Sequence, residues 1–349
     1  MAEIARRARV ERLVAAARLL ANPEAEAGRT LRQRLVETTG LSAAGIELGL
    51  TRCLETQPAP LHLDALLEGT PEAPRAHVLL SANVFVGALR AIAIGLASSA
   101  NVQVRPSRRD PALAEALHHV APDLFELTTS LSPEPGDHFW AYGSDTTITA
   151  LRGSLAPGVW FHPHGAGLGA VVVDAATFNQ ADARAIALDT ALFDQNGCLS
   201  PRVVCVLGKS EQAEGVAEAI ARALGALERE VPIGERSAPE LAEARRDRDT
   251  AAYAFEVFEA GSSWVSVSTT PVVPPSGRHL HVVPSADAVE TLAPLLPHIT
   301  CISTDAGALG ARLRQAFTGA RVVALGDMQR PPLDGPVDRR HGTQGELLR

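Results

Sequence analysis

Cysteine is scarce in this sequence, and its spacing shows no metal-binding or disulfide pattern. The four cysteines are Cys53, Cys198, Cys205 and Cys301, and they form neither a CxxC pair nor a Cys/His ligand spacing. Such spacing gives no support for a disulfide framework or a zinc site. We therefore expect a protein of the reducing cytoplasm without a bound metal.

A basic surplus and a long apolar run are also missing. The formal net charge is −8, whereas nucleic-acid-binding domains usually carry a positive surplus. No run of about 18 apolar residues is present to span a membrane, because Arg90 interrupts the nearest approach, at residues 85–100. The first residues lack the apolar core of a signal peptide. We expect no nucleic-acid partner and no membrane span, while a local basic site stays open.

The length of 349 residues predicts two domains rather than one core. Residues 2–57 have the pattern of amphipathic helices and carry no chemical motif. Thr39-Gly40-Leu41-Ser42 supplies a helix stop followed by a new N-cap, and Pro58-Ala59-Pro60 closes the region. We assign residues 1–60 to an N-terminal helical layer.

After this layer, short apolar runs alternate with helical windows, which predicts a mostly parallel sheet covered by helices. The pattern resumes after residue 165 and predicts a second α/β domain. The predicted strands are 77–81, 102–104, 138–142, 159–162, 169–173, 203–207, 264–268, 279–283, 299–303 and 321–325. The predicted helices are 84–97, 111–120, 146–151, 180–194, 211–229, 240–258, 286–296 and 306–317.

Only Cys198 among the cysteines has a loop setting. Residues 180–194 are rich in helix formers, Asn196-Gly197 is a helix stop, and residues 203–207 predict a buried strand. A thiol on the intervening turn can face a cleft, where surrounding backbone N–H groups favour the thiolate. On these residues alone, a small buried cysteine that fills space explains the pattern equally well.

This loop resembles a known nucleophile. Gln195-Asn196-Gly197-Cys198 resembles the nucleophile loop of the aldehyde dehydrogenase superfamily, and Cys198-Leu199-Ser200-Pro201 before a strand resembles its LuxC-type branch, the fatty acyl-CoA reductases. Residues 326–342, with the sequence GDMQRPPLDGPVDRRHG, resemble the closing segment of that branch. With similarities at 263–265 and 278–284, the resemblance extends over roughly residues 30–345. It implies an aldehyde-dehydrogenase-like α/β fold, with a Rossmann-type cofactor domain and a catalytic domain.

The resemblance also implies a cofactor site. Val104-Arg105-Pro106-Ser107 resembles the superfamily's Lys-Pro-Ser segment at the adenosine end of the cofactor. Arg108 stands where NAD-preferring members often carry a glutamate, and Arg109 follows it. A guanidinium can pair with a 2′-phosphate that a carboxylate would repel, so we expect NADPH, with NADH as the alternative. The residues alone are equally those of a solvated basic pair before a helix that Asp110 caps.

Two further segments match the superfamily. Tyr142-Gly143-Ser144 resembles the Gly-Ser turn beside the cofactor pyrophosphate, where a helix N-terminus offers free N–H groups. Asn83 stands where the superfamily holds the oxyanion, although an asparagine between a strand and a helix is by itself more often a cap. Residues 165–169 are not a GxGxxG motif, and residues 203–210 lack the first glycine of a P-loop.

His162-Pro163-His164 lies where hydrolytic members carry a glutamate that activates water. No carboxylate occurs between Val159 and Val173. A metal site would need a further ligand cluster, which the sequence lacks. We expect a structural or proton-relay role for these two histidines.

The implied reaction is reduction of a fatty acyl thioester, on CoA or an acyl carrier, to an aldehyde. The resemblance makes Cys198 the acyl acceptor and Asn83 an oxyanion donor, and it assigns Arg105, Ser107, Arg108, Gly143 and Ser144 to the cofactor. We assign residues 61–165 to the cofactor domain, 166–326 to the catalytic domain and 327–349 to a C-terminal arm. A homo-oligomer is expected, together with a partner protein that activates or transfers acyl groups.

Three other functions stay open. They are an aldehyde dehydrogenase that oxidises aldehydes, a cysteine acyltransferase or thioesterase without redox chemistry, and a non-catalytic subunit of an acyl-activating complex. Chain length, carrier and pathway are not readable, because the apolar side chains of an acyl pocket look like core in a sequence.

Overall fold

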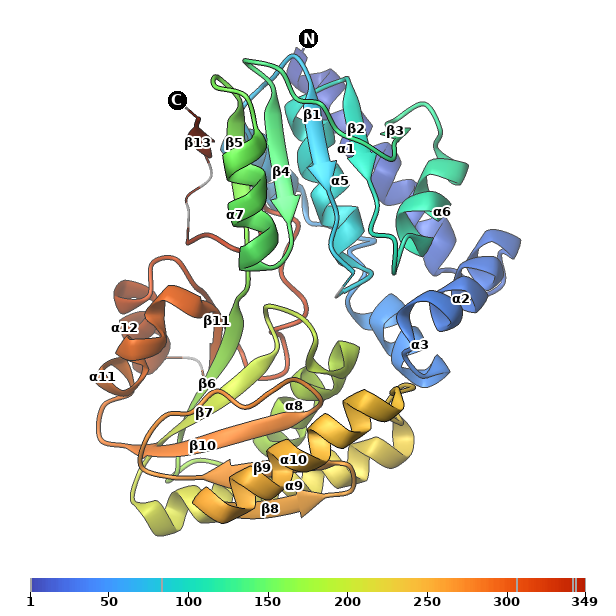
Figure 1. The fold of residues 1–349 in the computed structure, drawn as a ribbon. Helices are drawn as coiled ribbons and strands as arrows, with labels where there is room; N and C mark the ends of the chain where they lie inside the picture. Colours follow the sequence, from blue (N-terminus) through green and yellow to red (C-terminus); the bar gives the residue numbers. More distant parts are fainter. Residues whose placement is uncertain (1, 83, 306, 341, 343, 349) are drawn as a thin grey trace. The chain divides into compact units, whose positions relative to one another are not determined.

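The computed structural model describes residues 2–82, 84–305, 307–340, 342 and 344–348 (Figure 1). It contains two compact units. Unit 1 comprises residues 1–39, 46–166 and 330–349, and unit 2 comprises residues 40–45 and 167–329. The functional roles assigned above to four segments stay a prediction.

Unit 1 contains a six-stranded sheet in the order β13-β5-β4-β1-β2-β3. Strands β1 to β5 run parallel, and β13 is antiparallel to β5. The order 3-2-1-4-5 is that of a dinucleotide-binding sheet, whose switch point lies between β1 and β4. The strands are β1 (Ala76–Leu79), β2 (Val102–Arg105), β3 (Glu126–Leu127), β4 (His138–Tyr142), β5 (Trp160–His164) and β13 (Glu346–Leu347).

Small side chains let a helix lie close to this sheet. Helix α5 (Gly87–Ser98) contacts β1, β2 and β4, and it carries α1 on its outer side. A Cβ at Gly95 would lie 3.0–3.1 Å from methyl groups of Val102 and Val78, which is tighter than an ordinary contact, so glycine favours this approach. The other helices of the first 166 residues are α1 (Ala2–Ala21), α2 (Glu26–Thr39), α3 (Ala43–Arg52), α4 (Pro60–Gly69), α6 (Ala112–Val120) and α7 (Asp145–Ser154).

Arg90 on α5 explains why the C-terminal segment belongs to unit 1. Its buried guanidinium donates to the carbonyl oxygens of Pro331, Pro332 and Gly335 at 2.6–2.8 Å. It also forms an ion pair with Glu55. The charge that interrupts an otherwise apolar helix therefore fastens residues 331–335 to α5.

Unit 2 contains a seven-stranded sheet in the order β12-β11-β6-β7-β10-β9-β8, in which β8 alone is antiparallel to its neighbour. Helices α8 and α9 cover one face, and α11 and α12 pack on the other. The strands are β6 (Leu168–Asp174), β7 (Pro201–Leu207), β8 (Glu256–Ala260), β9 (Ser263–Val267), β10 (His279–Ser285), β11 (Ile299–Thr304) and β12 (Arg321–Val323). The helices are α8 (Gln180–Ala191), α9 (Ser210–Glu230), α10 (Ala238–Ala254), α11 (Ala288–Leu292), α12 (Ala308–Ala316) and the 3₁₀ segments η1 (Leu192–Gln195) and η2 (Ala293–His298).

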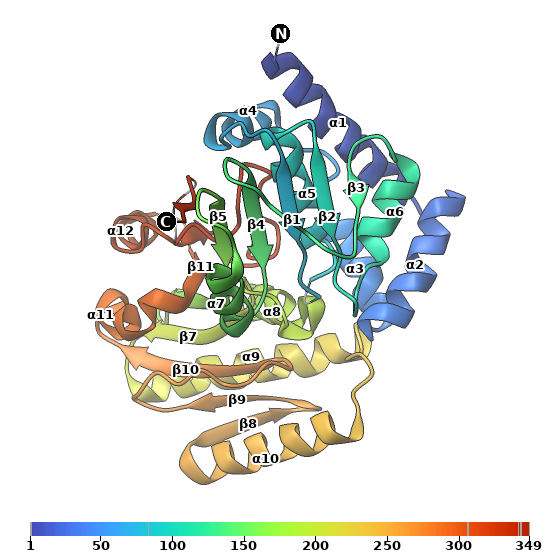
Figure 2. The ribbon, with the colours of Figure 1, turned by 45° about the horizontal axis from the view of Figure 1, so that its top comes forward.

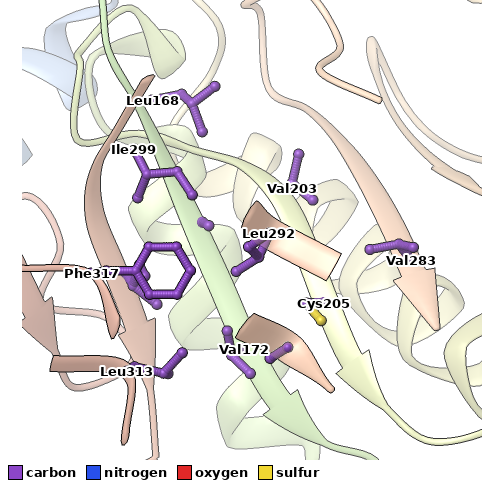
Figure 3. Close-up of a cluster of buried hydrophobic side chains, with 12 residues drawn as sticks. Leu168, Val172, Val203, Cys205, Val283, Leu292, Ile299, Leu313 and Phe317 are labelled. Carbon is purple, nitrogen blue, oxygen red and sulfur yellow. The ribbon is translucent and has the colours of Figure 1, made fainter. Parts of the chain in front are cut away.

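Figure 3 shows the core under α11 and α12, where Val172, Val203 and Cys205 of the sheet meet Leu292 and Phe317. Cys205 is one of its buried members. This cysteine therefore has the space-filling role that the sequence left open for Cys198.

The prediction of an α/β fold with mostly parallel sheets is confirmed. Two predicted helices are too long. The helix at 180–194 ends at Ala191, and the helix at 240–258 ends at Ala254, after which β8 pairs with β9. Figure 2 shows α10 beside β8 and β9. Val257 and Phe258 favour a strand over a helix, and their antiparallel pairing with β9 agrees with that preference. No described helix is long and apolar enough to cross a membrane.

Candidate active-site residues

Cys198 lies in a turn between η1 and β7 and is half-buried, whereas Cys53, Cys205 and Cys301 are buried. Burial raises the pKa of the Cys205 thiol to about 11 and also raises that of Cys301. Neither of these two thiols can supply a thiolate at neutral pH. Cys198 is therefore the accessible nucleophile among the four cysteines.

The backbone before this cysteine is strained. Phe193, Asp194 and Gln195 have φ values of 55°, 49° and 64°. Left-handed backbone costs a non-glycine residue about 1–2 kcal/mol. Three such residues in succession persist only where the surroundings hold them, and strain of this kind gathers at functional sites.

The Asp194 carboxylate is one anchor of this segment. Its Oδ1 accepts from Arg278 Nη2 at 2.6 Å and Nε at 2.9 Å, and its Oδ2 accepts from the Gly234 N–H at 2.9 Å. Arg278 is only 2% exposed and also donates to the Val231 carbonyl at 2.7 Å. The ion pair therefore joins the nucleophile loop to the residue before β10 and to the segment after α9.

Gln195 is the second anchor. Its fully buried amide donates to the carbonyl oxygens of Pro201 and His279, each at 2.6 Å, and accepts from the His279 N–H at 2.8 Å. Pro201 begins β7 and His279 begins β10, and the two strands are neighbours. The turn that carries Cys198 is thereby fixed to the first residues of two strands.

Residues after the cysteine are held as firmly. Thr300 donates its hydroxyl to the Cys198 carbonyl, and Gln329 donates to the Ser200 hydroxyl at 2.9 Å. A Cβ at Gly169 would collide with the Met328 methyl group and the Leu199 carbonyl. Gly169 therefore serves the close approach of β6 to the nucleophile loop, and residues 165–169 are not a nucleotide motif.

In unit 1, the residues predicted to hold the cofactor lie at the carboxyl ends of the parallel strands. Arg105 ends β2, and Gly143-Ser144 joins β4 to α7. Ser144 caps α7 by accepting from the Thr147 N–H at 3.2 Å. This edge is where open α/β sheets bind their ligands.

The basic segment after β2 is free of acidic partners. Arg108 and Arg109 are exposed, and no described carboxylate forms an ion pair with them or with Arg105. Ser107 accepts the Arg109 N–H at 3.2 Å. Asp110 was expected to cap the following helix; Pro111 occupies the N-cap position, but the buried Asp110 carboxylate accepts from the N–H of Ala112, the first helical residue, and lies 3.4 Å from the Thr38 hydroxyl. Burial raises the pKa of its carboxyl group to about 6.

A cavity of about 330 Å³ lies on the α7 side of this sheet. Leu79, Phe139, Leu151 and Leu155 supply apolar walls, and Arg105 supplies a cation. Residues 128–137, between β3 and β4, form no helix, so only a loop covers the sheet there. Apolar walls beside a guanidinium suit an adenine ring with a phosphate, so the residues present fit a nicotinamide dinucleotide. Asn83 lies outside the described residues.

His162 and His164 lie on β5 and are both buried. His162 Nε2 is 2.8 Å from His138 Nδ1, and Trp140 stacks on the His162 ring at 4.3 Å between ring centroids. Burial lowers the pKa of His162 to about 2 and that of His138 to about 4. Both are neutral at pH 7, and no cluster of metal ligands exists among the described residues.

Comparison with known proteins decides the family. The model of the acyl-CoA reductase (LuxC) family matches residues 68–335. The chain belongs to the LuxC family of acyl-CoA reductases. It is therefore an oxidoreductase that acts on acyl or aldehyde groups. A search of the curated proteins found no match.

Solved structures share the fold of this LuxC-family chain. An NAD-dependent benzaldehyde dehydrogenase from Corynebacterium glutamicum is 14% identical, with a TM-score of 0.67 over 94% of this chain and 82% of its own. A methylmalonate-semialdehyde dehydrogenase from Oceanimonas doudoroffii is 13% identical, with a TM-score of 0.66 over 94% and 79%. Aldehyde dehydrogenase 21 from Physcomitrella patens, in complex with succinate, is 14% identical, with a TM-score of 0.66 over 94% and 78%. The predicted aldehyde-dehydrogenase-like fold is confirmed.

Proposed function

We propose that this LuxC-family protein reduces a fatty acyl thioester to an aldehyde through an acyl group on Cys198. The observation that carries the proposal is the setting of Cys198, which is the one accessible cysteine of the four and sits on a strained turn anchored at both sides. A rigid turn holds a nucleophile in one orientation toward a bound carbonyl carbon, and such positioning lowers the barrier to attack.

The proposed reaction has two stages, and the acyl-enzyme is the intermediate between them. The Cys198 thiolate attacks the thioester carbonyl carbon, the bond from that carbon to the CoA or carrier sulfur breaks, and the CoA or carrier leaves as a thiolate that takes up a proton from water. The reduced nicotinamide, when bound, supplies the hydride that lowers the acyl group to the aldehyde level. The Cys198 carbon–sulfur bond then breaks, which releases aldehyde and restores the thiolate. The Cys198 backbone N–H and the Asn83 amide are proposed to stabilise the oxyanion in both attacks.

We assign the cofactor to the carboxyl edge of the unit 1 sheet. Arg105 and Arg108 would hold a 2′-phosphate, Ser107 the neighbouring ribose, and Gly143 with Ser144 the pyrophosphate at the start of α7. The free guanidinium groups support NADPH over NADH, because no described carboxylate neutralises them. The substrate is proposed to be acyl-CoA or an acyl carrier thioester, and the homo-oligomer and the acyl-transferring partner stay predictions.

Oxidation of NADPH and of NADH against a panel of acyl-CoAs, with aldehyde detection, tests this function. We expect one aldehyde per NADPH consumed, and loss of both signals in Cys198→Ala but not in Cys53→Ala. CoA release without NADPH oxidation would instead indicate a thioesterase or an acyltransferase. Neither cofactor binding nor acylation would indicate a non-catalytic subunit, and activity confined to aldehyde oxidation would indicate an ordinary aldehyde dehydrogenase.

A further inference from the structure

Two half-buried arginines in unit 2 have no acidic partner. Arg202, the second residue of β7, donates to the Pro274 carbonyl at 2.6 Å, and Arg236, between α9 and α10, donates to the Gly277 carbonyl at 3.1 Å. Among the described residues, no carboxylate forms an ion pair with either of them. Burial lowers the pKa of Arg202 to about 10, which still leaves it charged at pH 7. A cation withdrawn from water costs free energy unless an anion compensates it.

Two aromatic side chains beside these arginines keep unused polar atoms. His279 of β10 and Trp264 of β9 face each other in register, and their rings stack at 4.6 Å between centroids. They are 1% and 4% exposed. Neither ring nitrogen of His279, nor Trp264 Nε1, makes a hydrogen bond to any described residue. Buried polar groups of this kind usually have a partner, and each costs about 1–3 kcal/mol without one.

Two of these donors lie close together beside Gly277. A Cβ placed on Gly277 would lie 3.1 Å from Arg236 Nη2 and 3.2 Å from His279 Nε2. The two nitrogens are therefore no farther apart than the sum of these distances, and the glycine between them, at φ 118°, has a backbone conformation that disfavours any side chain. The charges of Arg236 and Arg202 both reach His279, since after burial they are the next causes that lower its pKa to about 3.

We propose that Arg202, Arg236, Trp264 and His279, which we call the Gly277 donor cluster, bind a phosphate group of the thioester substrate. The cluster offers two permanent positive charges, an indole N–H and one N–H of a neutral imidazole. A phosphate is the ligand that supplies both negative charge and several acceptor oxygens. The identity of the ligand rests on the proposed function, because acyl-CoA carries a diphosphate and a 3′-phosphate and an acyl carrier carries a phosphodiester.

Hydrogen bonds of Gln195 connect the Gly277 donor cluster to the turn that carries Cys198. Gln195, three residues before Cys198, binds both the N–H and the carbonyl of His279. The same side chain binds the carbonyl of Pro201, next to Arg202. A phosphate held here is therefore fixed with respect to the turn of Cys198, so the cluster can set the position of a thioester that reaches that turn.

Calorimetric titration of CoA into Arg236→Gln and Trp264→Phe tests the cluster. Arg236→Gln removes one charge, and Trp264→Phe keeps the stacked ring while removing its N–H. We expect CoA affinity to fall about 10- to 100-fold in Arg236→Gln and several-fold in Trp264→Phe. In steady state, the KM for acyl-CoA should rise by similar factors while kcat changes little. Arg229→Gln on the surface of α9 is the matched control and should match the wild type.

Melting temperatures separate a folding defect from a lost contact. Both variants should melt close to the wild type in buffer without phosphate. Inorganic pyrophosphate should raise the melting temperature of the wild type and of Arg229→Gln, should raise that of Trp264→Phe less, and should raise that of Arg236→Gln least. Unchanged CoA affinity, or an unchanged response to pyrophosphate, in either variant would overturn the proposal.

Three thiols, CoA, dephospho-CoA and pantetheine, identify the phosphate because they carry different phosphate groups. If the 3′-phosphate is bound, the wild type prefers CoA to dephospho-CoA about tenfold and Arg236→Gln loses that preference. If the diphosphate is bound, Arg236→Gln weakens CoA and dephospho-CoA equally. Pantetheine should bind all variants alike in both cases. If pyrophosphate binds through the cluster but the protein reduces no acyl-CoA, the site is supported and the proposed function is rejected. If the protein reduces acyl-CoA and both variants keep the wild-type KM, the function is supported and the site is rejected.

Discussion

Arg278 and Asp194 form a buried ion pair at 2.6 Å in which both residues have left-handed backbone, with φ values of 67° and 49°. The attraction between the two side chains holds two unfavourable backbone conformations at once. Because Asp194 lies four residues before Cys198, the same ion pair stabilises the fold and holds the nucleophile in position.

Asp194→Asn isolates the charge, because asparagine tolerates left-handed backbone and keeps an acceptor oxygen. The change leaves the Arg278 guanidinium buried without a counter-ion, and we expect a loss of about 3–5 kcal/mol in unfolding free energy. Acylation of Cys198 in a single turnover should also slow, even in the folded fraction. Glu230→Gln is the control, because its pair with Arg184 is exposed and contributes about 0–1 kcal/mol. Wild-type acylation rates in folded Asp194→Asn would contradict a positioning role.

Cys198 should be the acyl acceptor. Intact mass spectrometry after incubation with acyl-CoA and no reductant should show one acyl adduct, because the other three thiols are buried. The adduct should vanish in Cys198→Ala and persist in Cys53→Ala. An adduct that maps to Cys205 or Cys301 would remove Cys198 from the mechanism.

The sequence predicted the strands of both sheets well, because their apolar runs are short and bounded by turn residues. β4 has the predicted bounds, and most other strands differ by one or two residues at an end. It missed three edge strands. Val257, Phe258 and the glycine turn at 261–262 could have indicated the hairpin of β8 with β9, whereas β3 and β13 pair only with strands distant in the chain. Propensity alone carries no information about such partners.

The nucleophile was readable from the sequence, but its support was not. Cys198 stood out because a helix stop and a strand flank it. Asp194 was predicted to end a helix, Gln195 was assigned to the nucleophile loop without an anchoring role, and Arg278 was predicted only to precede a strand. Their roles depend on left-handed backbone and on contacts 84 residues apart in sequence, and no local pattern indicates either.

The cofactor should be NADPH. Arg108→Glu places a carboxylate where a 2′-phosphate would bind, so NADPH affinity should fall about 10- to 100-fold while NADH affinity changes little. Asp110, which follows Arg108 and Arg109 in the sequence, is buried, so its carboxylate does not compete with a 2′-phosphate for their guanidinium groups. Arg245→Glu, exposed on α10, controls for the change in net charge. An equal loss of affinity for both cofactors would contradict the assignment of the 2′-phosphate to this segment.

The buried histidines of unit 1 should make its stability depend on pH. The native pKa values of His138 and His162, about 4 and about 2, lie below the ordinary value near 6.5, so the unfolded chain binds more protons. The unfolding free energy that these neutral histidines contribute is complete above pH 6.5. It is lost as the pH falls below 6.5, by about 2 kcal/mol for each histidine at pH 5. Denaturant unfolding between pH 5 and 7.5 should show this slope, which should shrink in His162→Gln and remain in the exposed-site control His119→Gln. A slope that is unchanged in His162→Gln would contradict the assignment.

Thioester reduction should dominate over release of free acid. Water attacks an acyl-cysteine efficiently only when a positioned base takes its proton, and such a base contributes about 10²–10⁴-fold. His162-Pro163-His164 stands at the place of the superfamily's glutamate, and the pKa of His162, about 2, and its bond to His138 make that histidine a poor base at pH 7. A glutamate at position 162 would be buried against Trp140, so this substitution would report on the stability of the fold and not on the reaction. His162→Gln keeps a polar group for His138 and should leave the ratio of aldehyde to fatty acid unchanged. Both products should be measured from one acyl-CoA with NADPH present, and fatty acid as the main product would replace the reductase by a thioesterase.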